Sequence, residues 1–169
     1  FTLNMSAFYV DYSDIQLETI DPNGGIAPQL QNSGVGEVKG VELEMRWSPM
    51  ESWFVETAVG HLDTEITEAD ATQVGGPAVG DRFPLVSKWS GAIAVIKELD
   101  LGTRGTFTPR VDYSYRTKVL FSPDNNPRNV MKSYGMMNAS IGWISSDDKY
   151  SLDLRVDNIF DKYIVNYSD

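Results

Sequence analysis

Acidic side chains offer the first candidates for chemistry in this sequence. Glu42 and Glu44 lie two positions apart, so in an extended strand both carboxylates point to the same face, as in a general acid–base pair. They are interleaved with Lys39 and Arg46, which is more typical of a charge ladder. No Ser–His–Asp or Cys–His arrangement accompanies them. We therefore predict that the chain is not an enzyme and has no catalytic residues.

Metal coordination is the second chemistry that these residue types could support. Cysteine is absent and His61 is the only histidine, which favours a surface or interface role for it over axial haem ligation. Oxygen ligands could bind Ca²⁺, but the four acids that follow lack the ordered spacing of an EF-hand loop. These acids are Asp63, Glu65, Glu68 and Asp70. The sequence therefore predicts a solvated acidic loop, with no metal site and no cofactor.

Glycines in the stretch GVGEVKG, residues 34–40, could suggest a phosphate-binding loop. The spacing does not match G-x-G-x-x-G, and the stretch precedes a strand rather than opening a helix. Gly36 and Gly40 are instead expected to relieve crowding where a strand leaves its loop.

The overall charge limits the partners. The formal net charge is −10, and nucleic-acid binding needs a basic face, so nucleic acid is excluded as a partner. No apolar run approaches the roughly 20 residues of a transmembrane helix. A length of 169 residues is enough for one domain, but Phe1 begins inside a strand-like pattern. We therefore expect the chain to be a piece of something longer.

The elements that must position these side chains are extended. Residues 106–116 show the pattern, with Val111 and Tyr113 on one face and Arg110 and Asp112 on the other. Seven such runs predict seven strands, at residues 1–12, 38–47, 53–62, 88–96, 106–116, 137–144 and 150–158. No segment has a convincing helical period. The sequence therefore predicts an all-β, antiparallel fold.

The connections between these runs alternate strictly between short and long. Short polar turns occupy residues 48–52, 97–103 and 145–149, whereas long connections follow the first, third and fifth runs. Long loops without structure are uncommon in compact soluble domains, but outer-membrane barrels combine short turns at one end with long loops at the other. The alternation therefore favours an up-and-down transmembrane β-barrel over a soluble antiparallel sandwich.

Aromatic residues are placed as a membrane barrel requires. Two belts can be identified: Trp47, Trp53, Trp143 and Tyr150 beside the short turns, and Tyr9, Trp89, Tyr113 and Tyr115 beside the long connections. Belts of amphipathic rings at both strand ends are typical of the two membrane–water boundaries. The strand pattern alone leaves the apolar face toward lipid or toward a soluble core, because both environments exclude charge.

Five stretches, in the same order along the chain, resemble motifs of TonB-dependent outer-membrane receptors. NSGVGEVKGVELEMRW (32–47) resembles their strand N-x-G-x-x-x-x-K-G-x-E-x-E, and PLVSKWSGAIAV (84–95) resembles the start of a later strand. VDYSYRTKVLF (111–121) resembles a strand end of the type D-Y-x-Y-R-x-K. YGMMNASIGW (134–143) and VDNIFDKYIV (156–165) resemble segments near the carboxyl end of the family.

The resemblance implies a 22-stranded transmembrane β-barrel in a Gram-negative outer membrane, closed by an amino-terminal plug. Residues 1–169 would be a carboxyl-terminal fragment of about seven strands, with the plug domain and the final strand absent. The implied function is active transport of a ferric siderophore, haem, cobalamin or oligosaccharide. Its implied partners are TonB, the plug and outer-membrane lipid. A passive porin and a soluble β-sandwich binding module are the alternatives.

This orientation assigns the charged side chains of the strands to the barrel lumen. The predicted lumen-facing residues are Glu42, Glu44, Arg46, Arg110, Asp112, Arg116, Asp153 and Arg155. We expect the arginines among them to pair across strands with carboxylates such as Glu44, Asp112 and Asp153. Ligand selection is expected in residues 13–36, 63–86 and 117–133, where Phe83 and Phe121 are candidate ligand-binding residues.

Overall fold

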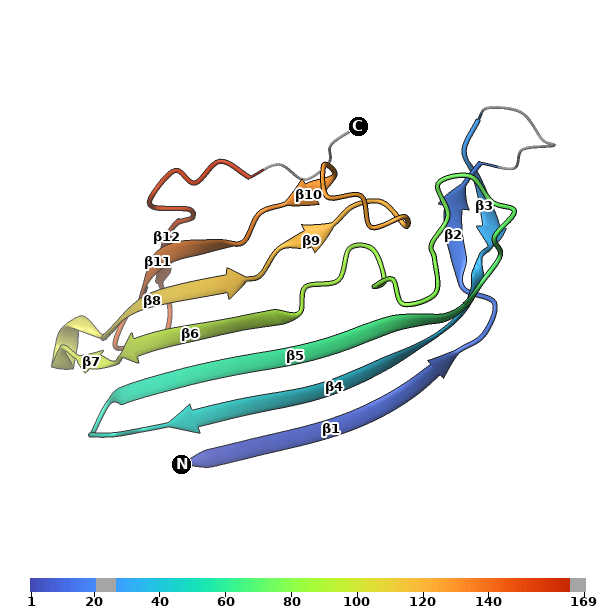
Figure 1. The fold of residues 1–169 in the computed structure, drawn as a ribbon. Coiled ribbons are helices and arrows are strands. Elements are labelled where there is room, and N and C mark those ends of the chain that lie inside the picture. Colours follow the sequence, from blue (N-terminus) through green and yellow to red (C-terminus); the bar gives the residue numbers. More distant parts are fainter. Residues whose placement is uncertain (21–26, 165–169) are drawn as a thin grey trace.

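The structure is a computed structural model that describes residues 1–20 and 27–164. Its main body is an antiparallel sheet in which seven long strands lie side by side in chain order (Figure 1). These strands are β1 (Thr2–Tyr12), β4 (Gly34–Trp47), β5 (Trp53–Ala69), β6 (Trp89–Lys97), β8 (Thr106–Arg116), β11 (Tyr134–Ile144) and β12 (Ser151–Val156). All seven expected strands are present, and the prediction of an all-β antiparallel fold is confirmed.

The shorter elements lie in the connections. Two small hairpins pair β2 (Gln16–Thr19) with β3 (Gln29–Asn32) and β9 (Val119–Leu120) with β10 (Val130–Met131). A further strand, β7 (Leu99–Asp100), pairs with β8 beside a 3-10 turn at Gly102–Arg104. Among the described residues, no helix has the length and apolar character needed to cross a membrane.

The short turns lie at one end of the sheet and the long connections at the other (Figure 1). In the third turn, the Asp147 carboxylate accepts a hydrogen bond from Ser145 Oγ at 2.8 Å and lies 3.0 Å from Lys149 Nζ. The Lys149 ammonium, helped by the Ser145 hydroxyl, holds the pKa of the Asp147 carboxyl below its usual value. Local side-chain contacts of this kind help to close the turn, and Ser146 Oγ also donates to the carbonyl of Thr103 at 3.0 Å.

The third strand extends further than expected. The prediction ended it at residue 62 and assigned 63–86 to a loop, but β5 continues to Ala69 and pairs with β4 as far as Gly34, across a bulge at Val35 and Gly36. The reason is that the alternation continues: Thr64 and Ile66 point to one face and are only 4% and 1% exposed. The intervening acids made this segment resemble a solvated loop. The expected loop at 13–36 is likewise partly strand, since it contains β2, β3 and the start of β4.

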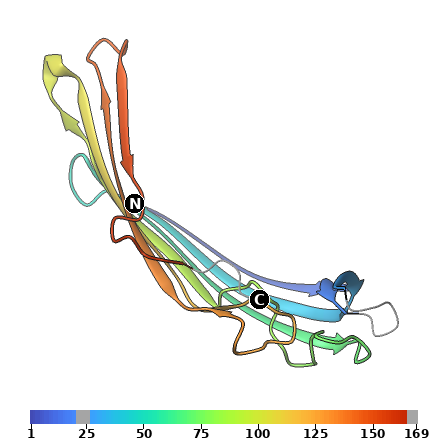
Figure 2. The same ribbon diagram turned by 90° about the horizontal axis from the view of Figure 1, so that it is seen from above.

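The cross-strand register gives the sheet an apolar and a polar face. Leu43 lies opposite both Met5 and Val59, and Val111 lies opposite both Val95 and Ala139. Figure 2 shows that the strands form a single curved layer. Val111 is 40% exposed, because no second sheet covers it. The soluble β-sandwich alternative is therefore wrong.

The most tightly packed part of the molecule lies at the end of the sheet that carries the long connections. Buried side chains at this end include Thr19, Ser33, Thr64, Ile66, Val119 and Met131, whereas Ala94 is buried on the sheet. The segment 70–88 is attached there by backbone hydrogen bonds from Ile66 N to Asp81 O and from Gly80 N to Ile66 O, at 2.8 and 2.9 Å. The end of the sheet that carries the long connections therefore contains a small core of buried side chains, whereas most of the sheet does not.

Glycines on β4 make room for aromatic rings, as the sequence predicts. Phe8 on β1 lies opposite Gly40, and its ring occupies the space that a Cβ at Gly40 would need. A Cβ at Gly36 would lie 2.6 Å from the ring of Phe83. Each glycine thus accepts a ring from a neighbouring segment, and any larger residue would displace that ring.

We expect Gly40→Ala to lower the free energy of unfolding of the full-length protein by about 1–3 kcal/mol, because the new Cβ overlaps the Phe8 ring. Denaturant unfolding followed by tryptophan fluorescence measures this change. Gly60→Ala is the matched control, since a Cβ there would have Ser90 Oγ as its nearest contact at 3.5 Å. Equal losses in the two variants would contradict the overlap, as would an undiminished loss in a Phe8→Ala background.

Candidate functional site

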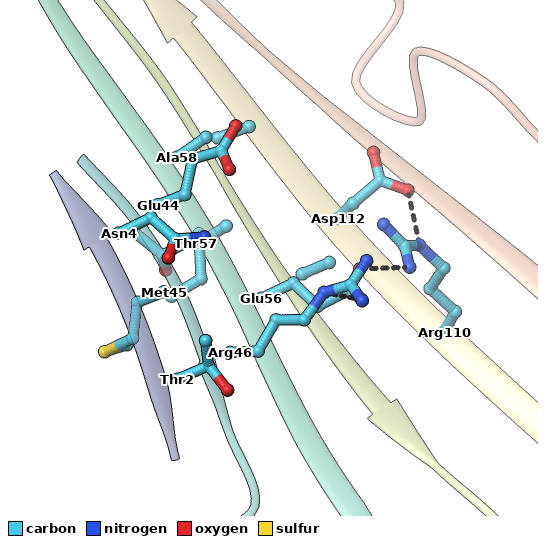
Figure 3. Close-up of a pocket in the computed structure, with 13 residues that line it drawn as sticks. Thr2, Asn4, Glu44, Met45, Arg46, Glu56, Thr57, Ala58, Arg110 and Asp112 are labelled. Atoms are coloured by element: carbon cyan, nitrogen blue, oxygen red, sulfur yellow. Dashed lines mark hydrogen bonds and ion pairs between the residues drawn. The ribbon is translucent and has the colours of Figure 1, made fainter. Parts of the chain in front are cut away.

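The candidate site is the polar face of the sheet. Glu42, Glu44 and Arg46 of β4 lie along one side of it, and Arg110, Asp112 and Arg116 of β8 lie along the other. Apart from Glu56, the positions between them on β5 and β6 carry small side chains: Ala58, Gly60, Ser90, Ala92 and Ala94. The result is two adjoining hollows of about 590 and 520 Å³, the first of which is shown in Figure 3.

Glu56 on β5 is the centre of the ion pairs on this face. Its Oε1 lies 3.5 Å from Arg46 Nε, and its Oε2 lies 3.1 Å from Arg110 Nη1 (Figure 3). Arg110 reaches Glu56 across the intervening strand β6, where the register places Ala94 between Glu56 and Asp112. Ala94 is only 4% exposed. A longer side chain at this position would stand in the path of the arginine.

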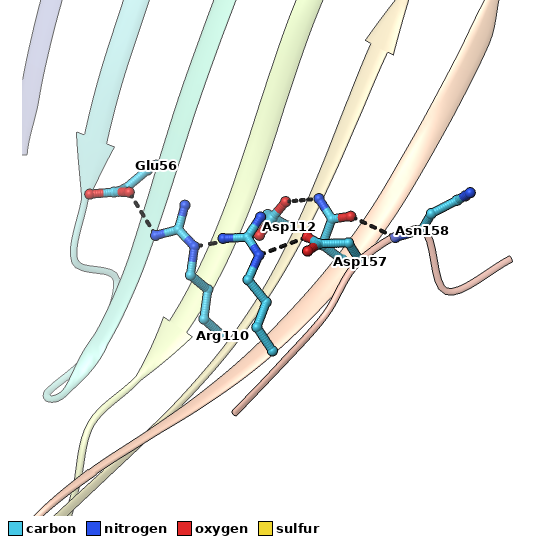
Figure 4. A network of polar contacts seen from close by, with 7 residues as sticks. Glu56, Arg110, Asp112, Asp157 and Asn158 are labelled. Atoms are coloured by element: carbon cyan, nitrogen blue, oxygen red, sulfur yellow. Dashed lines mark hydrogen bonds and ion pairs between the residues drawn. The ribbon is translucent and has the colours of Figure 1, made fainter. Parts of the chain in front are cut away.

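The polar contacts continue from Arg110 to the carboxyl-terminal side of the sheet (Figure 4). Arg110 Nε lies 3.6 Å from Asp112 Oδ1, and Asn138 Nδ2 donates to Asp112 Oδ2 at 2.7 Å. Asn138 Oδ1 accepts from the backbone N–H of Asn158 at 2.9 Å. One chain of contacts therefore joins β4, β5, β8 and β11 to the segment that follows β12.

The ion pairs differ from those predicted. Glu44 and Asp153 form no ion pair within the part of the chain that the structure describes, and Asp112 pairs with an arginine of its own strand. Arg155 pairs at 2.7 Å with Asp157, which lies just after the end of β12, and the Arg116 guanidinium lies 6.0 Å from the centre of the Tyr134 ring. Cross-strand pairing does occur, since Arg46 and Arg110 both pair with Glu56, but the partner is not one of the carboxylates named in the prediction. Glu56 lies directly opposite Arg46 in register, and the arginine side chain of Arg110 is long enough to reach it across β6.

Glu56 was absent from the predicted set of residues. The signal that could have found it is its position: it shares a face with Ala58 and Gly60, opposite the apolar positions of residues 53–62. Strand parity alone would therefore have placed it with Arg46, its register partner.

Phe83 lies against the sheet. Its ring contacts Tyr12 edge-to-face, with 6.0 Å between ring centres, and its N–H donates to Thr64 Oγ1 at 3.1 Å. Phe121 follows β9, and its N–H donates to the carbonyl of Asn129 at 2.9 Å. The structure thus gives Phe83 a packing role and places Phe121 in the connection between β8 and β11.

The two connections that carry these phenylalanines are joined to each other. The Asn125 side chain accepts from Arg82 N at 3.2 Å and donates to Arg82 O at 2.8 Å. Leu85 N donates to Leu120 O at 2.8 Å. These hydrogen bonds therefore join segments 70–88 and 117–133 into one layer, at the end of the polar face that carries the long connections.

The residues considered for metal binding do not converge. His61 packs on Trp89, with 4.3 Å between ring centres. Asp63 pairs with Lys88 at 3.4 Å, and Asp70 accepts from the Thr72 hydroxyl at 2.6 Å, which lowers the pKa of the Asp70 carboxyl. No group of three or more acids or histidines suited to a metal ion occurs in residues 1–20 and 27–164.

We predict that Glu56→Gln lowers the free energy of unfolding of the full-length protein by about 0.5–1 kcal/mol at low salt, because two partly exposed ion pairs are lost. The loss should shrink in high salt, and denaturant unfolding at two ionic strengths measures both effects. Glu44→Gln is the control, since Glu44 has no ion pair among the described residues. A loss that is the same for both variants, or unchanged by salt, would show that Glu56 is not the centre of the pairs.

Comparison with known proteins identifies the family. A family model described as "TonB dependent receptor-like, beta-barrel" matches residues 1–159. The pesticin receptor of Yersinia enterocolitica is 28% identical over 170 residues, which cover 98% of this chain and 23% of that protein. The pesticin receptor of Yersinia pestis has the same identity and coverage. The chain spans less than a quarter of the length of these relatives.

Solved structures show the same fold. The ferric yersiniabactin uptake receptor FyuA from Yersinia pestis superimposes with a TM-score of 0.75 at 24% identity, over 98% of this chain and 23% of that one. The ferric preacinetobactin receptor BauA from Acinetobacter baumannii gives 0.71 at 17% identity, over 96% and 23%. The resemblance found in the sequence is thereby confirmed. The chain belongs to the TonB-dependent receptor family and is a stretch of the β-barrel of a Gram-negative outer-membrane protein.

Proposed function

We propose that this chain is part of the barrel wall of an active transport receptor that takes up a ferric siderophore through TonB. The observation that carries the proposal is the single-layer sheet, apolar on one face and charged on the other, which aligns with receptor barrels over nearly its whole length. Solved relatives are named as a ferric yersiniabactin uptake receptor, a ferric preacinetobactin receptor and a siderophore receptor. Haem, cobalamin and oligosaccharides have no such support among these relatives.

The polar face is the proposed lumen surface. Placing it toward lipid would put Glu56, Arg110 and Asp112 against hydrocarbon, and a charge at the bilayer midplane costs roughly 2–4 kcal/mol. The apolar face carries Leu43, Val111 and Ile141 and suits acyl chains. The same orientation makes Glu42, Glu44, Arg46, Arg116, Asp153 and Arg155 lumen-facing, and places the two aromatic belts on the lipid side.

The wall requires further strands. The outer edges of β1 and β12 have no neighbouring strand among the described residues. Hydrocarbon offers no water for the backbone groups of such an edge, so in a membrane each edge must pair. We therefore propose that residues 1–169 belong to one 22-stranded barrel domain, with the plug and the final strand supplied by other parts of the polypeptide.

The loop end is the proposed place of ligand selection. Segments 70–88 and 117–133 join above the polar face, and the hairpin β2–β3 flanks them (Figure 1). We propose that Phe121 contacts the ligand there. Phe83 packs against the sheet and helps to hold this layer in place. Membership of the TonB-dependent receptor family contradicts the passive porin alternative.

Uptake experiments test the proposed transport. Iron-starved Gram-negative cells that produce the full-length protein are given radioactive ferric yersiniabactin or ferric preacinetobactin, the complexes named for two solved relatives. We expect accumulation of at least one complex, and its loss on adding a protonophore or deleting TonB. Uptake that continues without TonB would show that passive diffusion accounts for the function.

Phe121→Ala should raise the concentration for half-maximal uptake about two- to tenfold, because one aromatic contact with the ligand is lost. Leu101→Ala is the control: Leu101 is 40% exposed and lies at the turn end of the sheet. Both variants must reach the outer membrane in equal amounts. An unchanged half-maximal concentration in Phe121→Ala would remove this residue from the ligand site.

A further inference from the structure

The guanidinium of Arg82 has two nitrogen atoms in an unusual environment. Its Nε and Nη2 atoms are shut off from solvent, and neither has a hydrogen-bond partner within the described part of the chain. Buried N–H groups without a partner are costly, because each has lost its hydration and gained no hydrogen bond in return. Such a group is expected to have a partner that the described residues do not supply.

The backbone around Arg82 is held on two sides. Asn125 binds both its N–H and its carbonyl, while the adjacent residues attach to β5 through the Ile66 N to Asp81 O bond and through Phe83 N to Thr64 Oγ1. The backbone at Arg82 is therefore held by segment 117–133 and by β5.

Two acids beside these contacts are engaged elsewhere: Asp81 precedes Arg82, and Asp124 precedes Asn125. Asp81 Oδ2 accepts from Ala78 N at 2.8 Å. Asp124 Oδ1 accepts from Ser122 Oγ at 2.5 Å and from Asn126 N at 3.1 Å. These carboxylates cap their own turns, and no ion pair joins either of them to Arg82 in residues 27–164.

The two unpartnered nitrogens lie on the same edge of the guanidinium. Their N–H groups point in parallel, which matches the two oxygens of a carboxylate. We propose that Arg82 is a carboxylate-binding residue at the junction of segments 70–88 and 117–133. The carboxylate belongs either to the transported ligand, in which case the site rests on the proposed function, or to a part of the polypeptide outside the described residues.

The test uses the full-length receptor in detergent and citrate as the carboxylate probe. Thermal unfolding is measured for wild type, Arg82→Gln, Arg82→Lys and Arg128→Gln, in citrate and in sodium chloride of equal ionic strength. Arg128 is the matched control, an exposed arginine in the neighbouring connection. If Arg82→Gln does not fold, Arg82→Lys takes its place, because it keeps the charge and loses the two-nitrogen edge.

Two results support the site and identify its source. For a ligand carboxylate, citrate raises the unfolding temperature of wild type, and Arg82→Gln weakens the apparent affinity about tenfold or more while Arg128→Gln does not. For a carboxylate of the same polypeptide, Arg82→Gln unfolds at a lower temperature than Arg128→Gln in chloride, and citrate has no specific effect.

Other results overturn the proposal. The proposal is wrong if Arg82→Gln and Arg128→Gln both unfold at the same temperature as wild type in both salts. It is also wrong if citrate still raises the unfolding temperature of Arg82→Gln. Thermal unfolding needs no transport, so a failure here is distinguishable from the failure of uptake to depend on TonB.

Discussion

Lateral hydrogen bonding between backbones is the constraint on which this structure depends. The seven strands form one layer, so packing against a second sheet cannot stabilise them, and each inner strand is held by its two neighbours. In hydrocarbon the same bonds are obligatory, because no water can satisfy an open amide. The register then decides which side chains meet lipid. A slip of one residue would turn Glu56 and Arg110 toward the apolar side and Val111 away from it.

Small residues give the polar face its shape. Apart from Glu56, β5 and β6 bring alanine, glycine and serine to the positions where β4 and β8 bring charges, so most of the middle of the face is lower than its sides. The depression at Ala94 lets Arg110 reach an acid two strands away. The charged side chains near the turns are consequently linked to one another. Glu42 and Glu44, further along β4, remain available to groups that face the polar side of the sheet.

The molecule combines two kinds of packing. Most of the wall has little core of its own and relies on its neighbours and surroundings, while the loop end has buried side chains such as Ile66 and Val119. There, aromatic rings fill the space above glycines, and the Asn125 side chain joins two connections. Connections with a core of their own have defined geometry. They can therefore position residues toward a ligand, which unstructured loops of the same length could not do.

Much of the architecture was determined by the sequence itself, because strand alternation is a local property with a period of two. It placed the seven strands, the turns at residues 48–52 and 145–149, and the separation of Val111 from Arg110. Motifs such as residues 32–47 identified the family. The tertiary structure alone decided the role of Glu56, the extension of β5 over Thr64 and Ile66, and the isolation of the Arg82 edge. These depend on which long side chains can reach one another across several strands and on where a loop folds back. Both are set by register and packing between segments far apart in the chain.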